Sequence, residues 1–433
     1  METTLTERRI SPGRTLLGSL QLPGDKSISH RYGMLAAFAS GSSRFTNFST
    51  GADCASTLAC MAALGAKVTR GEDGSVEVTG LGGHFEAPGT ALDCGNSGST
   101  MRMLSGLIAG QKGEFTLIGD ESLSRRPMER IRKPLTAMGA RIALTEGHAP
   151  IHIAGVPLTG MDYTTPIPSA QVKTALLFAG LSAKGTTTIR EGLRTRDHGE
   201  LALRAFGAKV ERTIDSISIA EGAELHAIQA AVPGDMSSAA FFLCAAALFP
   251  DSSLVLTKLG LNPTRATLLD VLTTLGAHVN VLDIEEKHGE LNGTVHVSAP
   301  KNGLGTAEIS GGLAAQLIDE IPVLAAIAPY TRDGIRIRDA RELRVKESDR
   351  IALVVQNLRA MGAEVTEHED GMDVPGNQTL HGATINSGGD HRIAMAFAIA
   401  ALKAEGDTLI QGAEAASISF PEFWNILDNI TER

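Results

Sequence analysis

A short pattern recurs about every 70 residues along this chain, and it limits the possible folds more than any other feature. In each copy an apolar residue is followed by Gly-Ala, by one variable residue, and by Val or Ile. The glycine suits a helix C-terminus that turns through the left-handed conformation, and the β-branched residue suits a following strand. Each unit is therefore expected to contain strands and two helices, and six units fill the chain, the last being degenerate around Ala404. The glycines of the five clear copies are Gly65, Gly139, Gly207, Gly276 and Gly362.

A second repetition divides the six units into two halves. Residues 23–27 (PGDKS) recur as residues 233–237 (PGDMS), and an apolar run follows both. A chain of 433 residues also exceeds what one hydrophobic core usually serves. The sequence therefore predicts two similarly folded α/β globules of three units each, with a cleft between them.

Cations at helix starts form the second strong pattern. Lys26 and Arg31 lie in the first turns of a predicted helix, where the N-terminus already carries partial positive charge. A bound anion would balance that charge. For one such segment a pair of solvated side chains is an equally good explanation, and the copy with Met236 indicates that this helix start needs no cation to fold. Similar basic starts are found at residues 95–102, 119–127, 169–173, 346–350 and 390–392.

Composition argues against several classes of protein. The net charge of −10 and the 4% aromatic content do not suit a general nucleic-acid surface or a base-stacking platform. Four cysteines without CxxC spacing indicate neither a zinc site nor a disulfide framework, and no HExxH pattern is present. Residues 1–9 lack an apolar signal-peptide core, and the apolar run 239–249 is too short to span a bilayer. We therefore expect a soluble, cytoplasmic monomer that uses no metal or cofactor and binds neither nucleic acid nor membrane.

The basic segments favour small, highly anionic ligands. Neither a GxxxxGK[ST] motif nor a GxGxxG motif after a strand is present, so nucleotide binding is disfavoured. Arginine binds carboxylate and phosphate through paired hydrogen bonds, whereas lysine acts as a point charge. The basic set carries more charge than one monophosphate needs, which indicates two anionic substrates bound together. The set comprises Lys26, Arg102, Arg126, Arg196, Lys346, Arg350 and Arg392.

Two carboxylates stand out against this basic set. Glu347 lies beside Lys346, and Asp319 lies in the otherwise apolar stretch 317–324. As a pair near a cationic cleft they are candidates for general acid and general base. Each also has a structural explanation, Glu347 as a carboxylate favourable to a helix N-terminus and Asp319 as a cap beside Pro322.

Four segments together resemble the EPSP synthase family, the 3-phosphoshikimate 1-carboxyvinyltransferases. They are residues 22–31 (LPGDKSISHR), 95–102 (GNSGSTMR), 344–350 (RVKESDR) and 390–395 (DHRIAM). The resemblance extends in order over essentially the whole chain. Three further segments are similar to the class II subgroup, which includes many glyphosate-tolerant enzymes: residues 169–173 (SAQVK), 196–200 (RDHGE) and 262–265 (NPTR).

The resemblance implies two inside-out α/β globules, each of three βαβαββ units, joined by a double chain crossover. Residues 1–22 and 234–433 would form one domain, because the N-terminal strand joins the C-terminal globule, and residues 23–233 would form the other. The implied reaction transfers the enolpyruvyl group of phosphoenolpyruvate to the 5-hydroxyl of shikimate 3-phosphate and releases phosphate. This step leads to chorismate and the aromatic amino acids, and it is the target of glyphosate.

The resemblance also implies roles for individual residues. Lys26 would contact both substrates, Asp319 would accept the proton of the 5-hydroxyl, and Glu347 would donate a proton. Shikimate 3-phosphate would be bound by Lys26, Ser27, Arg31, Ser169, Ala170, Gln171, Arg196, Asp319 and Lys346. Phosphoenolpyruvate would be bound by Lys26, Asn96, Gly98, Arg126, Gln171, Arg350 and Arg392.

Three positions depart from the family pattern. Ala170 stands where class I members have a second serine, Ser99 replaces the usual threonine, and the class I lysine near Ile418 is absent. Gly98 keeps the small residue that leaves room beside phosphoenolpyruvate, so tolerance to glyphosate is only a hypothesis for this chain.

Two alternative functions stay open at this point. A UDP-sugar enolpyruvyl transferase shares the fold, but it typically carries a reactive cysteine in a flexible loop, and none of the four cysteines here lies in a comparable loop. A non-catalytic anion sensor would use the same cleft, although the presence of both Asp319 and Glu347 favours an enzyme.

Overall fold

The computed structural model describes residues 6–433, which form two compact units. Unit 1 comprises residues 6–23, Pro233–Glu285 and Leu291–Arg433, whereas unit 2 comprises Gly24–Val232 and Glu286–Glu290. Unit 1 is therefore built from both ends of the chain, and unit 2 from one nearly continuous segment. Residues 1–5, which belong to the N-terminus predicted to lack a leader and to the predicted domain 1–22, lie outside the described residues.

Three four-stranded sheets of unit 2 share one connectivity over the described residues. They are β6 (Leu92–Asp93)-β7 (Gly113–Ile118)-β9 (His148–Gly155)-β8 (Arg141–Thr145), β11 (Asp162–Thr165)-β13 (Thr187–Glu191)-β15 (Ser216–Ile219)-β14 (Val210–Arg212), and β16 (Gln229–Ala231)-β3 (Ser42–Thr46)-β5 (Val76–Thr79)-β4 (Lys67–Arg70). In each order the first two strands pair in parallel and the other two add in antiparallel fashion. Burial alternates along β3 and β5, so one face of their sheet is covered and the other is exposed. A two-stranded pair, β10 (Leu158–Thr159) with β12 (Ala183–Lys184), completes the unit.

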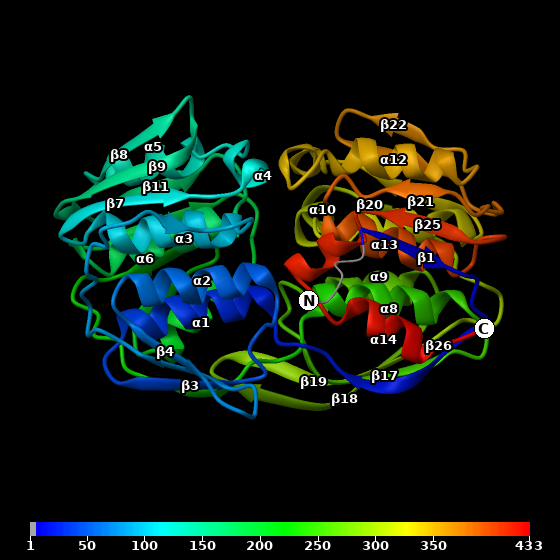
Figure 1. Cartoon of the computed structure of the whole chain (residues 1–433), viewed down its shortest axis with the longest axis horizontal. Helices are drawn as coiled ribbons and strands as arrows, with labels where there is room; N and C mark the ends of the chain where they lie inside the picture. The colour runs from blue at the N-terminus through cyan, green and yellow to red at the C-terminus, as the bar shows by residue number, and fades with distance from the viewer. Residues whose placement is uncertain (1–5) are drawn as a thin grey trace. The chain divides into compact units, whose positions relative to one another are not determined.

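The centre of unit 2 is helical. The central helices are α1 (Lys26–Phe38), α3 (Gly98–Ala109) and α6 (Ala170–Gly180), and α3 contacts both others (Figure 1). They are apolar on nearly all sides and almost wholly buried, as expected of core helices. A side chain at Gly106 would lie 1.9 Å from the Ala175 carbonyl oxygen, so glycine is required where α3 meets α6. The helices α2 (Ala52–Ala63), α5 (Glu129–Ala137) and α7 (His198–Ala205) bury one side only.

Unit 1 also has buried helices covered by sheets, but its sheets combine strands from both ends of the chain. Its sheets are β18 (His278–Lys287)-β19 (Glu290–Ser298)-β17 (Ser253–Gly260)-β2 (Thr15–Gln21)-β26 (Thr431–Glu432), β20 (Thr306–Ile309)-β21 (Gly334–Ile337)-β23 (Gly371–Val374)-β22 (Thr366–His368), and β1 (Glu7–Ile10)-β25 (Thr408–Gln411)-β24 (Thr384–Asn386). Its fully buried helices are α8 (Met236–Leu248), α11 (Ile321–Ile327) and α13 (His391–Ala401), and α9 (Thr267–Thr274), α12 (Arg350–Ala360) and α14 (Phe423–Ile430) are partly exposed. The predicted α/β architecture, with helices inside and sheets outside, is confirmed in each unit.

The repeated glycine has the conformation that the sequence predicts. Each of the five follows a helix with a positive φ, from 88° at Gly362 to 103° at Gly65, and a strand begins within a few residues. The predicted basic helix starts also coincide with helix N-termini, including those of α1, α3, α6, α12 and α13. No helix within residues 6–433 is long and apolar enough to cross a membrane.

Candidate active site

The residues predicted to bind substrate fall into two sets, one in each unit. Most of them lie at the N-termini of the buried helices, where unpaired amides and the helix dipole favour anions. Unit 2 holds Lys26, Ser27, Arg31, Asn96, Gly98, Arg126, Ser169, Ala170, Gln171 and Arg196. Unit 1 holds Asp319, Lys346, Glu347, Arg350 and Arg392.

Lys26 is the first residue of α1. Asp25 caps this helix by accepting a hydrogen bond from the Ile28 amide at 2.9 Å. The Lys26 ammonium donates to Asp53 Oδ2 on α2 at 2.8 Å, and the two side chains are only 16% and 8% exposed. Asp53 therefore supplies the negative charge that an ammonium beside a helix N-terminus requires, and it orients Lys26 before any substrate binds.

Arg31 connects the start of α1 to the start of α6. Its Nη1 donates to the Ser27 carbonyl at 2.8 Å, and its Nη2 donates to Thr174 Oγ1 at 3.0 Å. Burial lowers the pKa of Arg31 to about 10, although the carboxylates of Glu200 and Asp25 oppose the shift. Arg31 is therefore charged at neutral pH within a buried environment, where an anionic ligand would stabilise it.

Two guanidiniums converge at the N-terminus of α3. Arg126 Nη2 donates to Asn96 Oδ1 at 2.8 Å, and Asn96 Nδ2 donates to Asp120 Oδ2 at 2.7 Å. A Cβ atom at Gly98 would lie 3.2 Å from the nearest guanidinium nitrogens of both Arg102 and Arg126. Glycine at this position therefore leaves room for both cations to approach the first turn of the helix.

The start of α6 joins the start of α3. Ser169 caps α6 by accepting a hydrogen bond from the Val172 amide at 3.4 Å, and Ala170 is the first helical residue. Gln171 accepts from Arg102 Nη1 at 2.7 Å and donates to Ser99 Oγ at 3.0 Å. The hydroxyl of the unusual Ser99 is thus used, because it fixes the orientation of the Gln171 amide.

Lys173 anchors the loop that carries Arg196. Its side chain is fully buried, and its ammonium lies 2.9 Å from Glu191 Oε2 and 2.9 Å from Glu200 Oε1. It also lies 3.5 Å from the carbonyl oxygen of Thr195, the residue before Arg196. The half-buried Arg196 is therefore presented by a loop whose backbone is held from inside the unit.

In unit 1, three arginines surround Asp319. Its Oδ1 lies 3.5 Å from Arg350 Nη1 and 3.7 Å from Arg392 Nε, and its Oδ2 lies 3.7 Å from Arg265 Nη1. Arg392 Nη1 also donates to the Asp319 carbonyl at 2.9 Å. Three guanidinium groups therefore lie within 3.7 Å of the Asp319 carboxylate.

Arg350 holds two further carboxylates. Its Nε lies 2.8 Å from Asp390 Oδ2, and its Nη2 lies 2.6 Å from Glu347 Oε2. Burial would lower the pKa of Arg350, but Asp390 and Glu347 outweigh burial and raise that pKa above its usual value. For Asp390 burial acts to raise the pKa, yet the charge of Arg350 prevails and lowers it. Arg350 is therefore a fixed cation that positions Glu347.

Lys346 is half-buried just after the 3-10 helix η2 (Arg341–Val345). Burial lowers the pKa of Lys346 below its usual value, although Asp319 and Glu342 oppose the shift. A lysine in such an environment gains from a negatively charged ligand, which favours its ammonium form.

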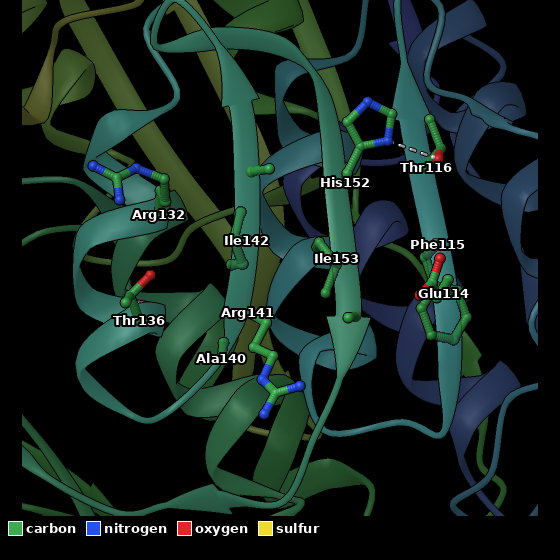
Figure 2. Close-up of a pocket in the computed structure, with 12 residues that line it drawn as sticks. Glu114, Phe115, Thr116, Arg132, Thr136, Ala140, Arg141, Ile142, His152 and Ile153 are labelled. Atoms are coloured by element: carbon green, nitrogen blue, oxygen red, sulfur yellow. Dashed lines mark hydrogen bonds between the residues drawn. The ribbon is translucent and has the colours of Figure 1, made fainter.

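A separate hollow of about 580 Å³ lies in unit 2 (Figure 2). It is formed by α5 and the strands β7, β8 and β9, and His152 on β9 is hydrogen-bonded to Thr116 at 3.0 Å. The cation Arg132 at its edge is already paired with Glu129 at 2.7 Å. None of the residues predicted to bind substrate lines this hollow, so it is not the candidate site.

Comparison with known proteins identifies the family. A sequence model of EPSP synthase (3-phosphoshikimate 1-carboxyvinyltransferase) matches residues 10–427. The 3-phosphoshikimate 1-carboxyvinyltransferase of Koribacter versatilis (strain Ellin345) is 62% identical over 425 residues, which cover 98% of this chain and 99% of that protein. The chain belongs to the EPSP synthase family. The enzyme of the same name from Solibacter usitatus (strain Ellin6076) is 52% identical over 430 residues, which cover 98% of this chain and 100% of that protein.

Solved structures of EPSP synthases support this assignment. An EPSP synthase from Acinetobacter baumannii matches with a TM-score of 0.87 and 38% identity, over 98% of each chain. The enolpyruvyl transferase NikO from Streptomyces tendae matches with a TM-score of 0.79 and 21% identity, covering 98% of this chain and 96% of that one, which shows a shared fold.

Sequence reasoning missed several charged partners in this EPSP synthase family member. Asp390 and Lys173 lie within quoted motifs, and Arg265 closes the NPTR segment, but none was given a role. Asp53 lies in the first turn of α2 and had no local signal, because only the packing of α2 against α1 brings it to Lys26. The 3-10 helix η3 (Ala413–Ile418) has the sequence AEAASI and contains no lysine.

Proposed function

We propose that this EPSP synthase family member transfers the enolpyruvyl group of phosphoenolpyruvate to the 5-hydroxyl of shikimate 3-phosphate and releases phosphate. It is accordingly a transferase of the shikimate pathway, acting on two small anionic substrates. The single observation that carries this proposal is the 62% identity with a 3-phosphoshikimate 1-carboxyvinyltransferase over nearly the full length of both chains.

The cations of unit 2 suit shikimate 3-phosphate. Lys26 and Arg31 lie within two turns of the α1 N-terminus, and Arg31 reaches the first turn of α6 through Thr174. Ser169, Ala170 and Gln171 form that turn, and Arg196 supplies a further cation. In this proposal the helix N-termini and the guanidiniums bind the 3-phosphate, and Lys26, Ser27 and Gln171 contact the rest of the molecule.

Phosphoenolpyruvate carries a phosphate and a carboxylate, so it needs more than one cation. Arg126 in unit 2 is directed by Asn96, and Arg350 and Arg392 in unit 1 are directed by Asp390 and Asp319. We assign these three arginines to phosphoenolpyruvate, with Asn96, Gly98, Gln171 and Lys26 beside them. Preformed cations stabilise the departing phosphate without reorganising during the reaction.

The proton transfers are assigned to two carboxyl groups of unit 1. Asp319 accepts the proton of the 5-hydroxyl, whose oxygen attacks C2 of phosphoenolpyruvate, and Glu347 donates a proton to C3. The resulting tetrahedral intermediate then loses the C3 proton and phosphate, which leaves the enolpyruvyl ether. Lys346 contacts the substrate hydroxyls, and its ammonium balances the charge that develops near Asp319.

The test is release of inorganic phosphate by the purified protein. We expect release when both shikimate 3-phosphate and phosphoenolpyruvate are present, and none when a UDP-sugar replaces shikimate 3-phosphate. The reverse preference would indicate a UDP-sugar enolpyruvyl transferase, and binding without release would indicate an anion sensor. Lys26→Met should abolish release, whereas Lys184→Met, at an exposed lysine of the same unit, should leave it unchanged. Near-normal release by Lys26→Met would refute the role of Lys26.

A further inference from the structure

A buried chain of polar side chains crosses unit 2 from α1 to the start of α3. His30 Nδ1 lies 2.7 Å from Thr57 Oγ1, Thr57 Oγ1 lies 2.6 Å from Thr100 Oγ1, and Thr100 Oγ1 lies 2.7 Å from Ser97 Oγ. All four residues have a relative exposure of 0%. We call these four residues the hydroxyl relay.

The relay has one consistent direction of donation. Burial lowers the pKa of His30 well below its usual value, and the charges of Lys26 and Arg31 act in the same direction, so the imidazole is neutral with one N–H. Thr100 donates its single hydroxyl proton to Ser97, so it accepts from Thr57, and Thr57 in turn accepts from His30 Nδ1–H. The buried Nε2 of His30 makes no hydrogen bond, so the ring is held through Nδ1 alone. Such a chain rigidifies its surroundings because its three hydrogen bonds have one consistent direction of donation.

The relay joins two segments to which the proposed function assigns substrate. His30 lies one helical turn after Lys26 on α1, and Thr57 lies one turn after Asp53 on α2. The pairs Lys26–Asp53 and His30–Thr57 are therefore two successive contacts between these helices. Ser97, at the far end, caps α3 by accepting from the Thr100 amide at 3.1 Å, and it lies between Asn96 and Gly98. The second link therefore continues to the backbone that carries the phosphoenolpyruvate contacts.

We propose that His30, Thr57 and Thr100 are positioning residues, which set the place of the Asn96–Ser97–Gly98 segment relative to Lys26 without contacting substrate. This inference rests on the proposed function. A displacement of about 1 Å in a substrate-binding segment is enough to cost on the order of 100-fold in rate, so a link of this kind has kinetic consequences beyond stability. The effect falls on phosphoenolpyruvate, because the relay ends at α3, whereas Ser169 and Arg196 lie on other elements.

The experiment compares four proteins by steady-state phosphate release and thermal unfolding. Thr57→Val keeps the shape of the side chain but removes both its donor and its acceptor, and we expect it to raise the KM for phosphoenolpyruvate about 10-fold. The KM for shikimate 3-phosphate should stay within about twofold of wild type, and Thr57→Ser should restore both constants because it restores the hydroxyl. The matched control is Thr187→Val, since Thr187 is equally buried in unit 2 but its hydroxyl has no hydrogen-bond partner.

The possible outcomes distinguish failure of the hydroxyl-relay inference from failure of the proposed function. If wild type is active and Thr57→Val lowers the melting temperature while both KM values stay unchanged, the relay is structural only and the inference is wrong. The inference is also wrong if Thr57→Ser fails to rescue. Should Thr57→Val not fold, Thr100→Val breaks the next link and is expected to give the same selective rise in KM, and an unchanged KM there refutes the relay. A wild-type protein that releases no phosphate would instead refute the proposed function.

Discussion

Lys173→Met should destabilise unit 2 strongly. The Lys173 side chain is 0% exposed, and its partners Glu191 and Glu200 are 4% and 0% exposed at 2.9 Å each. Removing the ammonium leaves two buried carboxylates close together, and Arg212 Nη1 lies 3.9 Å from Glu200 Oε1, beyond hydrogen-bond distance. Deleting one partner of a buried ion pair typically costs about 3–5 kcal/mol, and we expect a loss of that size because the methionine cannot compensate either charge.

Urea denaturation with two probes measures this loss. Far-ultraviolet circular dichroism follows both units, whereas fluorescence of Trp424, the single tryptophan, follows unit 1. We expect a lower midpoint in the circular dichroism transition, with a smaller change in the Trp424 transition. Adding Glu200→Gln to Lys173→Met removes one of the two uncompensated charges and should restore at least about 1 kcal/mol, which is the size of coupling found between contacting residues.

A surface lysine provides the control for this prediction. Lys184→Met removes an exposed ammonium of the same unit and should change stability by less than about 0.5 kcal/mol. A loss below about 1 kcal/mol for Lys173→Met, or no recovery on adding Glu200→Gln, would refute the reasoning that Lys173 compensates buried charge.

Two further predictions concern substrate binding and pH. Gly98→Ala places a methyl group 3.2 Å from guanidinium nitrogens of Arg102 and Arg126. The KM for phosphoenolpyruvate should therefore rise about 10-fold, or ~1.4 kcal/mol, in steady-state assays, with no loss of melting temperature. An unchanged KM would show that neither cation needs its present position. The hydrogen bonds from Arg338 lower the pKa of Asp373 to about 2, below its value in the unfolded chain. The contribution of the ionised Asp373 to the free energy of unfolding is therefore present at neutral pH and is lost as the pH falls from about 4 toward 2. The side chains of Arg338 and Asp373 are both one-third exposed, so Asp373→Asn should lower the free energy of unfolding by no more than about 1 kcal/mol at pH 7, as measured by urea denaturation. A stability difference from wild type that persists at pH 2 would contradict the role of the Asp373 charge.

The fold was largely predictable because its signals are local. A glycine at a helix end, followed by a β-branched residue, specifies a helix-to-strand turn without reference to the rest of the chain, and Gly65, Gly139 and Gly207 all adopt φ near 100°. Burial of α8 on every side follows equally from its unbroken apolar run. The permuted strand order of each sheet, with β16 beside β3 and β2 beside β17, carries no local signal, and its expectation came from the family resemblance.

From the residues alone, the sequence predicted seven cations and the two carboxylates Asp319 and Glu347 as candidate site residues. Lys26, Arg350 and Arg392 lie at helix starts, where their charge is unusual and so indicates an anion. The acidic groups that hold them, such as Asp53 and Asp390, are ordinary residues at helix starts when only the sequence is considered. Which carboxylate neutralises which cation is decided by helix packing, and the pattern of charges along the chain does not contain that information.

The strand β2 is made early during synthesis, but the strands with which it pairs are made much later. Its residue Leu16 donates its amide to Ser252, 236 residues later, and β2 also pairs with β17 and with β26 at the C-terminus. At translation rates of roughly 5–20 residues per second, β2 waits on the order of 10–50 s for its first partner, while residues 24–232 of unit 2 emerge in one piece and are able to fold. For that interval the apolar side chains of Leu16 and Leu22, which are both buried in the finished fold, lack the residues that cover them. The sheet that contains β2 therefore cannot form before the residues of β17 are made, although β2 precedes every strand of unit 2 in the sequence.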